Sequence, residues 1–284
     1  MDSYGSFWIY HNYVDVREIV IMARISVLMG IYNCASTLIE ALDSLYAQTY
    51  QDFKIILCDD GSHDNTYEIA KKYAEKHDNI VLISNGENKG LNYTLNHCLE
   101  YADTEYCARM DGDDISLPTR FEKEIEFLDT HLEYAIVSCP MIHFDEKGDF
   151  RYGQEKGEPS INSYVINTPF CHAPCMVRTE VYKKVGGYTV SPKLLRVEDY
   201  HLWAKMFAAR YRGYTLPEHL YKMRDDRDAV KRRTWQARKN EMYVKYLGAK
   251  MLNIPWYYWF YIIKPLIAYV IPPFIYRIIH KYAK

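Results

Sequence analysis

From residue 25 onward, the chain alternates short apolar runs with longer amphipathic segments. The apolar runs have the length of buried strands, and the longer segments carry apolar residues at helical spacing. Strands that are separated by helices of about ten or more residues form βαβ units, so the alternation predicts an α/β fold with a mostly parallel sheet. The predicted strands are 25–31, 53–58, 80–83 and 105–110, and the predicted helices are 36–48, 65–77 and 90–101.

The second half of the chain alternates less regularly. The stretch 145–159 is polar and contains glycine, so we expect a surface loop there. A helix is expected to begin at Glu198, because Leu202, Met206 and Phe207 then fall on one side of it. The other predicted elements are a helix at 117–132 and strands at 135–139 and 171–177.

Three of the predicted strands end in conspicuous polar side chains. Tyr32 follows the first strand, Asp59 and Asp60 end the second, and Asp111 and Asp113 follow the fourth. Ligands of open parallel sheets bind beyond the carboxyl ends of the strands. Because those ends meet at one edge of the sheet, the sequence predicts a ligand site there.

Asp111 and Asp113 are separated only by Gly112, so a tight turn can present both carboxylates to one side. Mg²⁺ and similar hard cations prefer oxygen ligands, and a cation with few protein ligands keeps positions open for a diphosphate. Such a cation can neutralise a phosphate leaving group. The pattern therefore favours a divalent metal site, with a solvated acidic turn as the plain alternative.

Tyr32 and Asp60 are candidates for contacts with a nucleoside. An aromatic ring at the end of a strand can stack on a nucleobase, although a tyrosine that is merely packed there fits the sequence almost as well. A carboxylate at a strand end can accept hydrogen bonds from a base or from ribose hydroxyls. A helix-capping turn is the alternative for Asp60, since Ser62 and Asp64 follow it.

Glu198 and Asp199 stand at the start of a predicted amphipathic helix. The helix dipole and the free N–H groups favour the ionised form of a carboxylate at this position. An ionised carboxylate can act as a general base that takes a proton from a hydroxyl. Routine helix capping explains the same residues without any catalytic role.

Some functional classes are disfavoured by what the sequence lacks. The turn after the first strand contains Gly30 but no G-x-G-x-x-G, and there is no G-x-x-x-x-G-K-[ST], which argues against dinucleotide-dependent oxidoreductases and P-loop enzymes. The net charge is -2, so we expect no nucleic-acid partner. Seven cysteines in apolar runs indicate buried free thiols in a reducing compartment, and we expect the protein to be cytoplasmic.

The two ends of the chain differ from its centre. Residues 1–22 lack the features of a signal peptide and precede the first strand. We expect them to be either a poorly ordered extension or the result of a wrongly assigned start, with Met22 as the alternative first residue. Residues 23–225 would form the catalytic domain and 226–284 a helical C-terminal region. Aromatic, interrupted by proline and basic at its end, the last part suits a membrane interface, and a helix pair packed on the domain is the alternative.

Six motifs in one order resemble those of glycosyltransferase family 2, and the resemblance covers roughly residues 24–225. Six motifs in a fixed order are far more specific than any one of them. They are VLMGIYN at 27–33, DDGS at 59–62, NKGL at 88–91, MDGDD at 110–114, GGY at 186–188 and EDYHLW at 198–203.

The resemblance implies a GT-A fold, which is a Rossmann-like α/β domain. It also implies a nucleotide-sugar donor that is usually UDP-linked, a Mg or Mn ion, and inversion of the anomeric carbon in a single displacement. By motif, Tyr32 and Asp60 would hold the base, Asp111 would meet the ribose or the metal, and Asp113 would ligate the metal. Asp199 would be the general base, and Glu198, Trp203 and His172 would lie on the acceptor side.

The chain is similar to bacterial enzymes that build surface polysaccharides, which implies a saccharide or lipid-linked saccharide acceptor at the inner face of the cell membrane. It departs from the processive synthases, because their Q-x-x-R-W signature is missing, so we expect transfer of a single sugar. A histidine that such sequences often carry after the last core strand is replaced here by the stretch Arg224 to Arg227, and we expect an arginine of this stretch to contact phosphate in its place. The competing hypotheses are a sugar nucleotidyltransferase and an inactive scaffold of a polysaccharide assembly complex.

Overall fold

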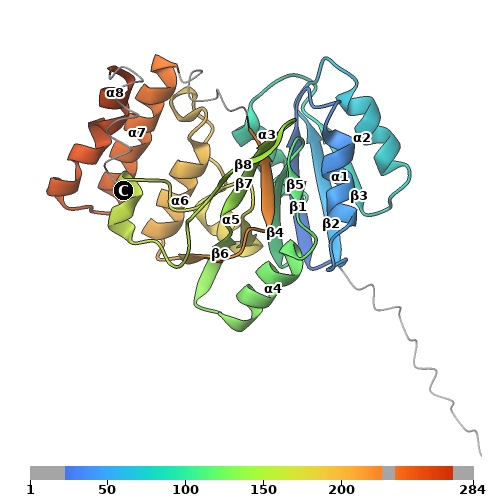
Figure 1. Cartoon of the computed structure of the whole chain (residues 1–284), viewed down its shortest axis with the longest axis horizontal. Helices are drawn as coiled ribbons and strands as arrows, with labels where there is room; N and C mark the ends of the chain where they lie inside the picture. The colour runs from blue at the N-terminus through green and yellow to red at the C-terminus, as the bar shows by residue number, and fades with distance from the viewer. Residues whose placement is uncertain (1–22, 226–233, 271–284) are drawn as a thin grey trace, which may run out of the picture.

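The computed structural model describes residues 23–225 and 234–270, and Figure 1 shows their arrangement. The predicted N-terminal extension, residues 1–22, lies outside the described residues. So do residues 226–233, which include Arg227, and residues 271–284 at the end of the predicted membrane segment.

A seven-stranded sheet in the order β10-β6-β9-β4-β1-β2-β3 forms the centre of the fold. β4, β1, β2 and β3 are parallel, whereas β9 runs antiparallel to both of its neighbours. The sheet is therefore mostly parallel, as predicted. Its strands are β1 (Ile25–Ile31), β2 (Phe53–Asp59), β3 (Ile80–Ser84), β4 (Tyr106–Asp111), β6 (Tyr134–Ser138), β9 (Met176–Arg178) and β10 (Arg212–Thr215).

The strands of this sheet bury side chains on both of its faces. In β1, Leu28 belongs to one hydrophobic core, while Val27 and Met29 belong to the other, as the period of two requires. Helices α3, α5 and α6 contribute to the first core, and α1, α2 and α4 to the second. The helices are α1 (Leu38–Tyr46), α2 (Thr66–Ala74), α3 (Leu91–Glu100), α4 (Arg120–Thr130), α5 (Thr179–Val185) and α6 (Glu198–Ala208) (Figure 1).

A smaller sheet in the order β5-β11-β7-β8 lies beside the first. The predicted loop at 145–159 is wrong in part, because β8 pairs antiparallel with β7 inside it. β8 is an edge strand with mostly exposed, polar residues, so it lacks the apolar signal of a buried strand. The predicted strand at 171–177 begins only at Met176. The strands are β5 (Ile115–Ser116), β7 (Met141–Asp145), β8 (Gly148–Tyr152) and β11 (Tyr221–Arg224).

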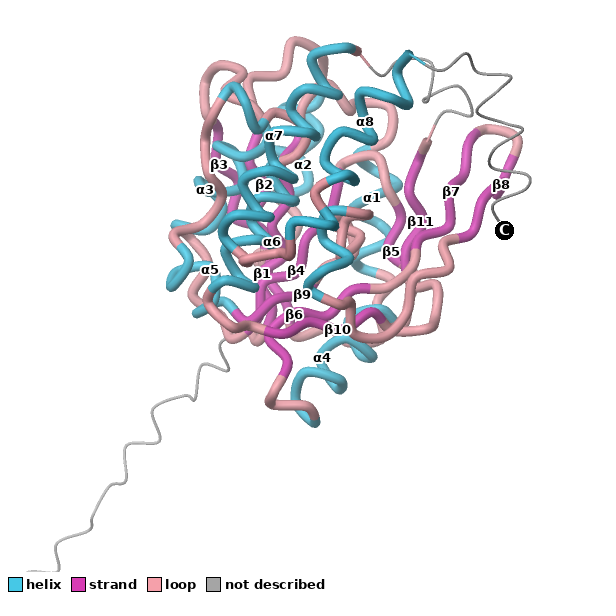
Figure 2. The backbone as a smooth tube through the Cα atoms, turned by 90° about the vertical axis from the view of Figure 1, so that its left-hand side faces the viewer, coloured by secondary structure: helices cyan, strands magenta, loops and turns pink. Residues whose placement is uncertain are grey.

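The C-terminal region is a helix pair, α7 (Trp235–Met251) and α8 (Phe260–Val270). α7 contacts α6, and α8 contacts α7, as Figure 2 shows from the side. Tyr164 links α7 to α6, because its hydroxyl donates a hydrogen bond of 2.9 Å to the carbonyl of Tyr200 and lies 3.4 Å from the carbonyl of Val244. Within residues 23–225 and 234–270, no helix has both the length and the apolar character that crossing a membrane would need.

A buried ion pair supports the strand that ends at the predicted metal site. Arg120 and Glu124 of α4 are both fully buried, and the Arg120 Nε lies 3.2 Å from each carboxylate oxygen. The Arg120 Nη2 also donates to the carbonyl of Arg109 in β4, at 2.9 Å. Burial raises the pKa of Glu124 to about 7, against the opposing effect of the Arg120 charge. This pair therefore connects α4 to the centre of β4.

We predict that Glu124→Gln lowers the free energy of unfolding by about 3 kcal/mol, because it leaves the guanidinium of Arg120 buried without a counter-charge. Urea unfolding above pH 7 measures the change. Glu180→Gln is the matched control, since Glu180 and Lys184 form an exposed ion pair of the same spacing. Equal stability of the two variants would show that the buried pair does not support the fold.

Candidate active site

The strand registers bring the predicted polar strand ends to one edge of the sheet. Gly30 of β1 is in register with Asp111 of β4, and Ile31 is in register with Asp59 of β2. Tyr32 and Asp60 follow directly after these positions. The predicted convergence of the three strand ends is therefore confirmed.

Tyr32 presents its ring at this edge. The side chain is 44% exposed, and its ring meets that of His63 edge to face, with the centroids 6.4 Å apart. The next residue, Asn33, has a φ of 49°, and its Oδ1 accepts a hydrogen bond of 2.8 Å from the backbone N–H of His63. The turn is thus fixed to the loop after β2, and a face of the Tyr32 ring stays available for stacking.

Asp60 is buried and holds the loop that follows β3. Its Oδ1 accepts hydrogen bonds from the Asn85 side chain, at 2.7 Å, and from the Lys89 N–H, at 2.8 Å. Its Oδ2 accepts one from the Gly90 N–H, at 2.9 Å. The observed contacts of Asp60 are therefore made to the protein itself, and its contact with a nucleoside stays a prediction.

Arg109 and Asp111 form a two-pronged ion pair at the end of β4. The Arg109 Nη1 lies 2.8 Å from Asp111 Oδ2, and Nη2 lies 2.6 Å from Oδ1. Arg109 is 4% exposed, whereas the side chain of Asp111 is 29% exposed. The buried guanidinium thus fixes the orientation of Asp111. Part of the Asp111 carboxylate stays exposed at this edge of the sheet.

Asp113 is exposed and forms no ion pair with any residue that the structure describes. Loss of hydration around its carboxylate and the negative charge of Asp111 raise its pKa. A divalent cation beside these two carboxylates would relieve their repulsion, so the residues fit Mg or Mn. Within the described ranges no three His, Cys, Asp or Glu side chains form a metal-binding group. The remaining coordination positions would therefore be filled by a ligand or by water.

The sequence reasoning gave Asp114 no role, yet this residue holds the turn after β4 in place. It is buried, its Oδ1 accepts from the Arg224 N–H at 2.8 Å, and burial and the charges of Asp111 and Asp113 raise its pKa. Arg224 Nε donates to the Asp113 carbonyl at 3.0 Å, and its Nη2 pairs with Glu40 of α1 at 2.5 Å. Arg224, expected to contact phosphate, here clamps the turn between β11 and α1.

Glu198 and Asp199 open α6, as predicted, but their pKa values follow burial more than the helix dipole. Burial raises the pKa of Asp199, and the Tyr200 N–H and the charge of Arg109 offset part of this effect. Burial and the charge of Asp199 raise the pKa of Glu198 to about 7. The dipole argument thus had the wrong sign for the net shift. A raised pKa makes Asp199 a stronger proton acceptor.

Arg109 connects the two acidic groups, and the sequence reasoning missed it. Its positive charge attracts the carboxylate of Asp111. The same charge offsets part of the rise in pKa that burial causes at both Glu198 and Asp199. The Arg109 Nε is buried and has no hydrogen-bond partner among the residues that the structure describes. The signal was present as one arginine inside an otherwise apolar strand, at a position where a buried charge requires a partner. One buried guanidinium is therefore paired with the carboxylate at the end of β4, and its charge also favours the ionised carboxylates at the start of α6.

His172 and Trp203, which were predicted to lie on the acceptor side, pack against each other. Their ring centroids are 5.7 Å apart, and His172 Nε2 lies 2.8 Å from the hydroxyl of Tyr188. Burial and the charge of Arg109 lower the pKa of His172 well below its usual range, so the imidazole is neutral. Trp203 has no exposed surface, so it can affect an acceptor only through its neighbours.

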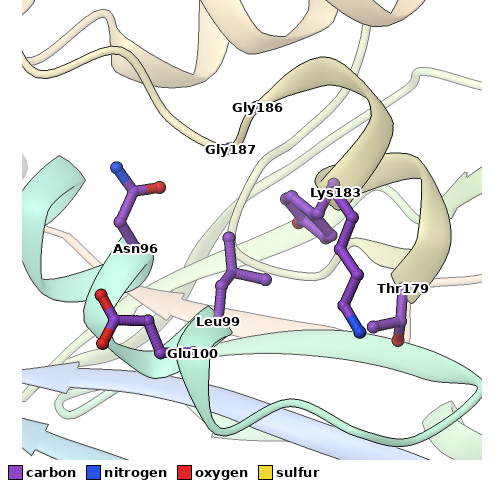
Figure 3. A pocket seen from close by; sticks show the side chains of 8 residues that line it. Asn96, Leu99, Glu100, Thr179, Lys183, Gly186 and Gly187 are labelled. Atoms are coloured by element: carbon purple, nitrogen blue, oxygen red, sulfur yellow. The ribbon is translucent and has the colours of Figure 1, made fainter.

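The GGY motif positions Tyr188 through a clasp from α3. The amide of Asn96 donates to the Tyr188 carbonyl at 2.8 Å and accepts from the Tyr188 N–H at 2.7 Å. Gly187 has a φ of 59°, and an added Cβ would lie 2.5 Å from the Asn96 oxygen, so only glycine fits. Asn96 and Gly187 are among the residues that line a pocket between α3 and α5 (Figure 3), and this pocket has a volume of about 230 Å³.

Comparisons with known sequences agree with this geometry. Residues 26–186 match the family described as "Glycosyl transferase family 2". The chain is 42% identical over 261 residues to the "Putative glycosyltransferase EpsE" of Bacillus subtilis, covering 91% of this chain and 93% of that protein. It is 30% identical over 187 residues to the Escherichia coli "UDP-Glc:alpha-D-GlcNAc-diphosphoundecaprenol beta-1,3-glucosyltransferase WfaP", covering 66% of this chain and 71% of that one.

Two solved structures share the fold. The crystal structure of S. aureus TarS 1-349 in complex with UDP-GlcNAc superposes with a TM-score of 0.64 at 19% identity, covering 81% of this chain and 70% of that one. The mannosyltransferase PcManGT from Pyrobaculum calidifontis, in complex with GDP-Man and Mn2+, superposes with a TM-score of 0.61 at 18% identity, covering 92% of this chain and 79% of that one. These likenesses support the expected GT-A architecture.

The family match is thus supported by a relative that aligns over nearly the whole chain, by the fold and by the acidic edge of the sheet. The chain belongs to glycosyltransferase family 2 and is a glycosyltransferase with a GT-A fold, not a nucleotidyltransferase.

Proposed function

We propose that this enzyme transfers a single sugar, with inversion, from a UDP-sugar to a hydroxyl of a lipid-linked saccharide during synthesis of a surface polysaccharide. The donor is inferred from WfaP, whose name specifies UDP-Glc, and from the UDP-GlcNAc complex of TarS. The acceptor class is inferred from WfaP, whose name specifies a diphosphoundecaprenol-linked sugar. Mg or Mn is inferred from the two carboxylates of the β4 turn and from the Mn2+ complex of PcManGT.

One observation carries the proposal: the buried guanidinium of Arg109 has Asp111 on one side, and its charge also reaches Asp199. An inverting transfer needs a group that supports the departing diphosphate and a base on the opposite face of the sugar. Asp111 and Asp113 suit the first task, and Asp199 suits the second. The arrangement therefore supports a proposal in which both tasks are carried out at a single site.

In the proposed reaction, Asp111 and Asp113 would hold the divalent cation, which when bound neutralises the charge that develops on the diphosphate. The exposed ring of Tyr32 would stack on the uracil. The carboxylate of Asp199 takes the proton of the acceptor hydroxyl as its oxygen bonds to the anomeric carbon. The bond from that carbon to the diphosphate oxygen breaks on the opposite face, so the configuration inverts.

We predict that Asp113→Ala abolishes the dependence of UDP binding on Mn²⁺. In the native enzyme, Mn²⁺ should raise the affinity for UDP at least about tenfold, since Asp111 and Asp113 would hold the cation and the cation would supply positive charge to the diphosphate. Isothermal titration calorimetry with and without EDTA measures both affinities. Asp78→Ala, which removes an exposed carboxylate elsewhere, should behave as the native enzyme does. An Asp113→Ala variant that keeps the full Mn²⁺ effect would place the metal elsewhere.

We predict that Asp199→Asn lowers kcat about 10³-fold and changes the Kd for UDP less than about threefold, because it removes a base and not a donor contact. In the native enzyme, kcat/KM should fall as pH drops through the pKa of Asp199. Since burial raises that pKa, the loss should occur above the pH at which an exposed aspartate titrates. A variant that retains a tenth of the native kcat would assign the base to another group, and Glu198→Gln tests the nearest one.

A further inference from the structure

The C-terminal helix pair exposes a set of large apolar side chains. The 3-10 helix η4 (Trp256–Tyr258) and α8 carry rings and branched side chains on their outer side. We call this set the aromatic face. Its members and their exposed fractions are Trp256 82%, Tyr257 62%, Phe260 63%, Ile263 45% and Ile267 42%.

The aromatic face is not needed to attach these helices to the domain. Ile254 and Ile262, which are 4% and 6% exposed, point inward and belong to the hydrophobic core. The Trp259 Nε1 donates to the Ile254 carbonyl at 3.0 Å and closes the turn before α8. The segment thus has one side that packs on the protein and another that holds apolar residues in contact with water. Contiguous exposed apolar side chains of this kind mark an interaction surface.

The C-terminal part of the sequence carries charge of a single sign. Residues 242–284 contain six lysines and arginines but no aspartate or glutamate, in a chain whose net charge is -2. Lys250, which precedes the face in the sequence, and Lys264, which lies within α8, are exposed. The other basic residue of the described part, Lys245, is buried and pairs with Glu241 at 3.3 Å. An occupant of the face should therefore be apolar at its centre and negative at its surface.

We propose that the aromatic face docks on the surface of an anionic phospholipid bilayer. Tryptophan and tyrosine favour the boundary between headgroups and acyl chains, and each exposed lysine near an anionic surface adds to the attraction. A second copy of the chain fits less well, since it would bring two segments of positive charge together. The inference deepens the proposed function, because a lipid-linked acceptor lies at such a surface.

The helix pair is joined to the element that carries Asp199, so docking would place the active site near the bilayer. Asn240 of α7 donates from its side-chain amide to the Leu195 carbonyl, at 3.1 Å, in the loop just before α6. The Tyr164 hydroxyl bridges α6 and α7, as described above. Figure 2 shows α6, α7 and α8 side by side. Because α8 packs on α7 and α7 packs on α6, docking of α8 on lipid would therefore hold the start of α6 close to the bilayer.

Co-sedimentation of the full chain with vesicles tests the proposal. One set contains phosphatidylcholine alone, and the other also contains about 30% phosphatidylglycerol, an anionic lipid. The native chain should sediment with the anionic vesicles, and Trp256→Ser/Phe260→Ser should bind at least about tenfold more weakly. Lys250→Gln/Lys264→Gln should reduce the preference for the anionic vesicles. Leu132→Ser, a control at an apolar residue that is 77% exposed on another side, should bind as the native chain does.

The proposal is overturned if the native chain stays in the supernatant with both vesicle types, or if Trp256→Ser/Phe260→Ser sediments as well as the native chain. It is also overturned if light scattering without vesicles shows a native dimer that this double variant converts to a monomer. UDP binding by calorimetry in the same samples separates the two proposals. Vesicle binding without UDP binding would contradict the proposed function but not the proposed docking on a bilayer. UDP binding without vesicle binding would contradict only the proposed docking.

Discussion

The site depends on one buried cation, the guanidinium of Arg109. An arginine that is 4% exposed within a strand is tolerable only when carboxylates compensate for its lost hydration. Asp111 does so directly through two short hydrogen bonds, and the charge also favours the ionised forms of Glu198 and Asp199. In the proposed function, the same guanidinium would orient a metal-binding carboxylate, Asp111, and lower the cost of burying the base, Asp199. The two proposed catalytic tasks would then share one electrostatic support.

The scaffold around this cation is built from contacts that cross the fold. Arg120 donates a hydrogen bond to the Arg109 carbonyl. On the side of the smaller sheet, Asp114 and Arg224 hold the turn after β4. On the acceptor side, the clasp of Asn96 fixes Tyr188, whose hydroxyl meets His172. A site whose side chains are locked by such supporting contacts needs little reorganisation during the reaction.

The sequence predicted what depends on local patterns. The strands from β1 to β4 and the convergence of Tyr32, Asp59 and Asp111 follow from the period of apolar residues and from the geometry of parallel sheets. The roles of Arg109 and Asp114 did not follow, because each rests on a partner that only the folded chain brings close. β8 was missed because an exposed edge strand has a polar sequence. The net pKa shift of Asp199 was missed because burial is a property of the whole fold.

The central claim is that the acidic edge of the sheet binds a nucleotide sugar through a divalent metal. Release of nucleoside diphosphate by the purified enzyme, from a panel of UDP-, GDP- and dTDP-sugars with Mn²⁺, Mg²⁺ or EDTA, tests it most directly. The account predicts slow release from a UDP-sugar that stops in EDTA and returns when Mn²⁺ or Mg²⁺ is restored. Silence across the panel, with no binding of any nucleotide sugar by calorimetry, would contradict it and favour a scaffold in a polysaccharide assembly complex.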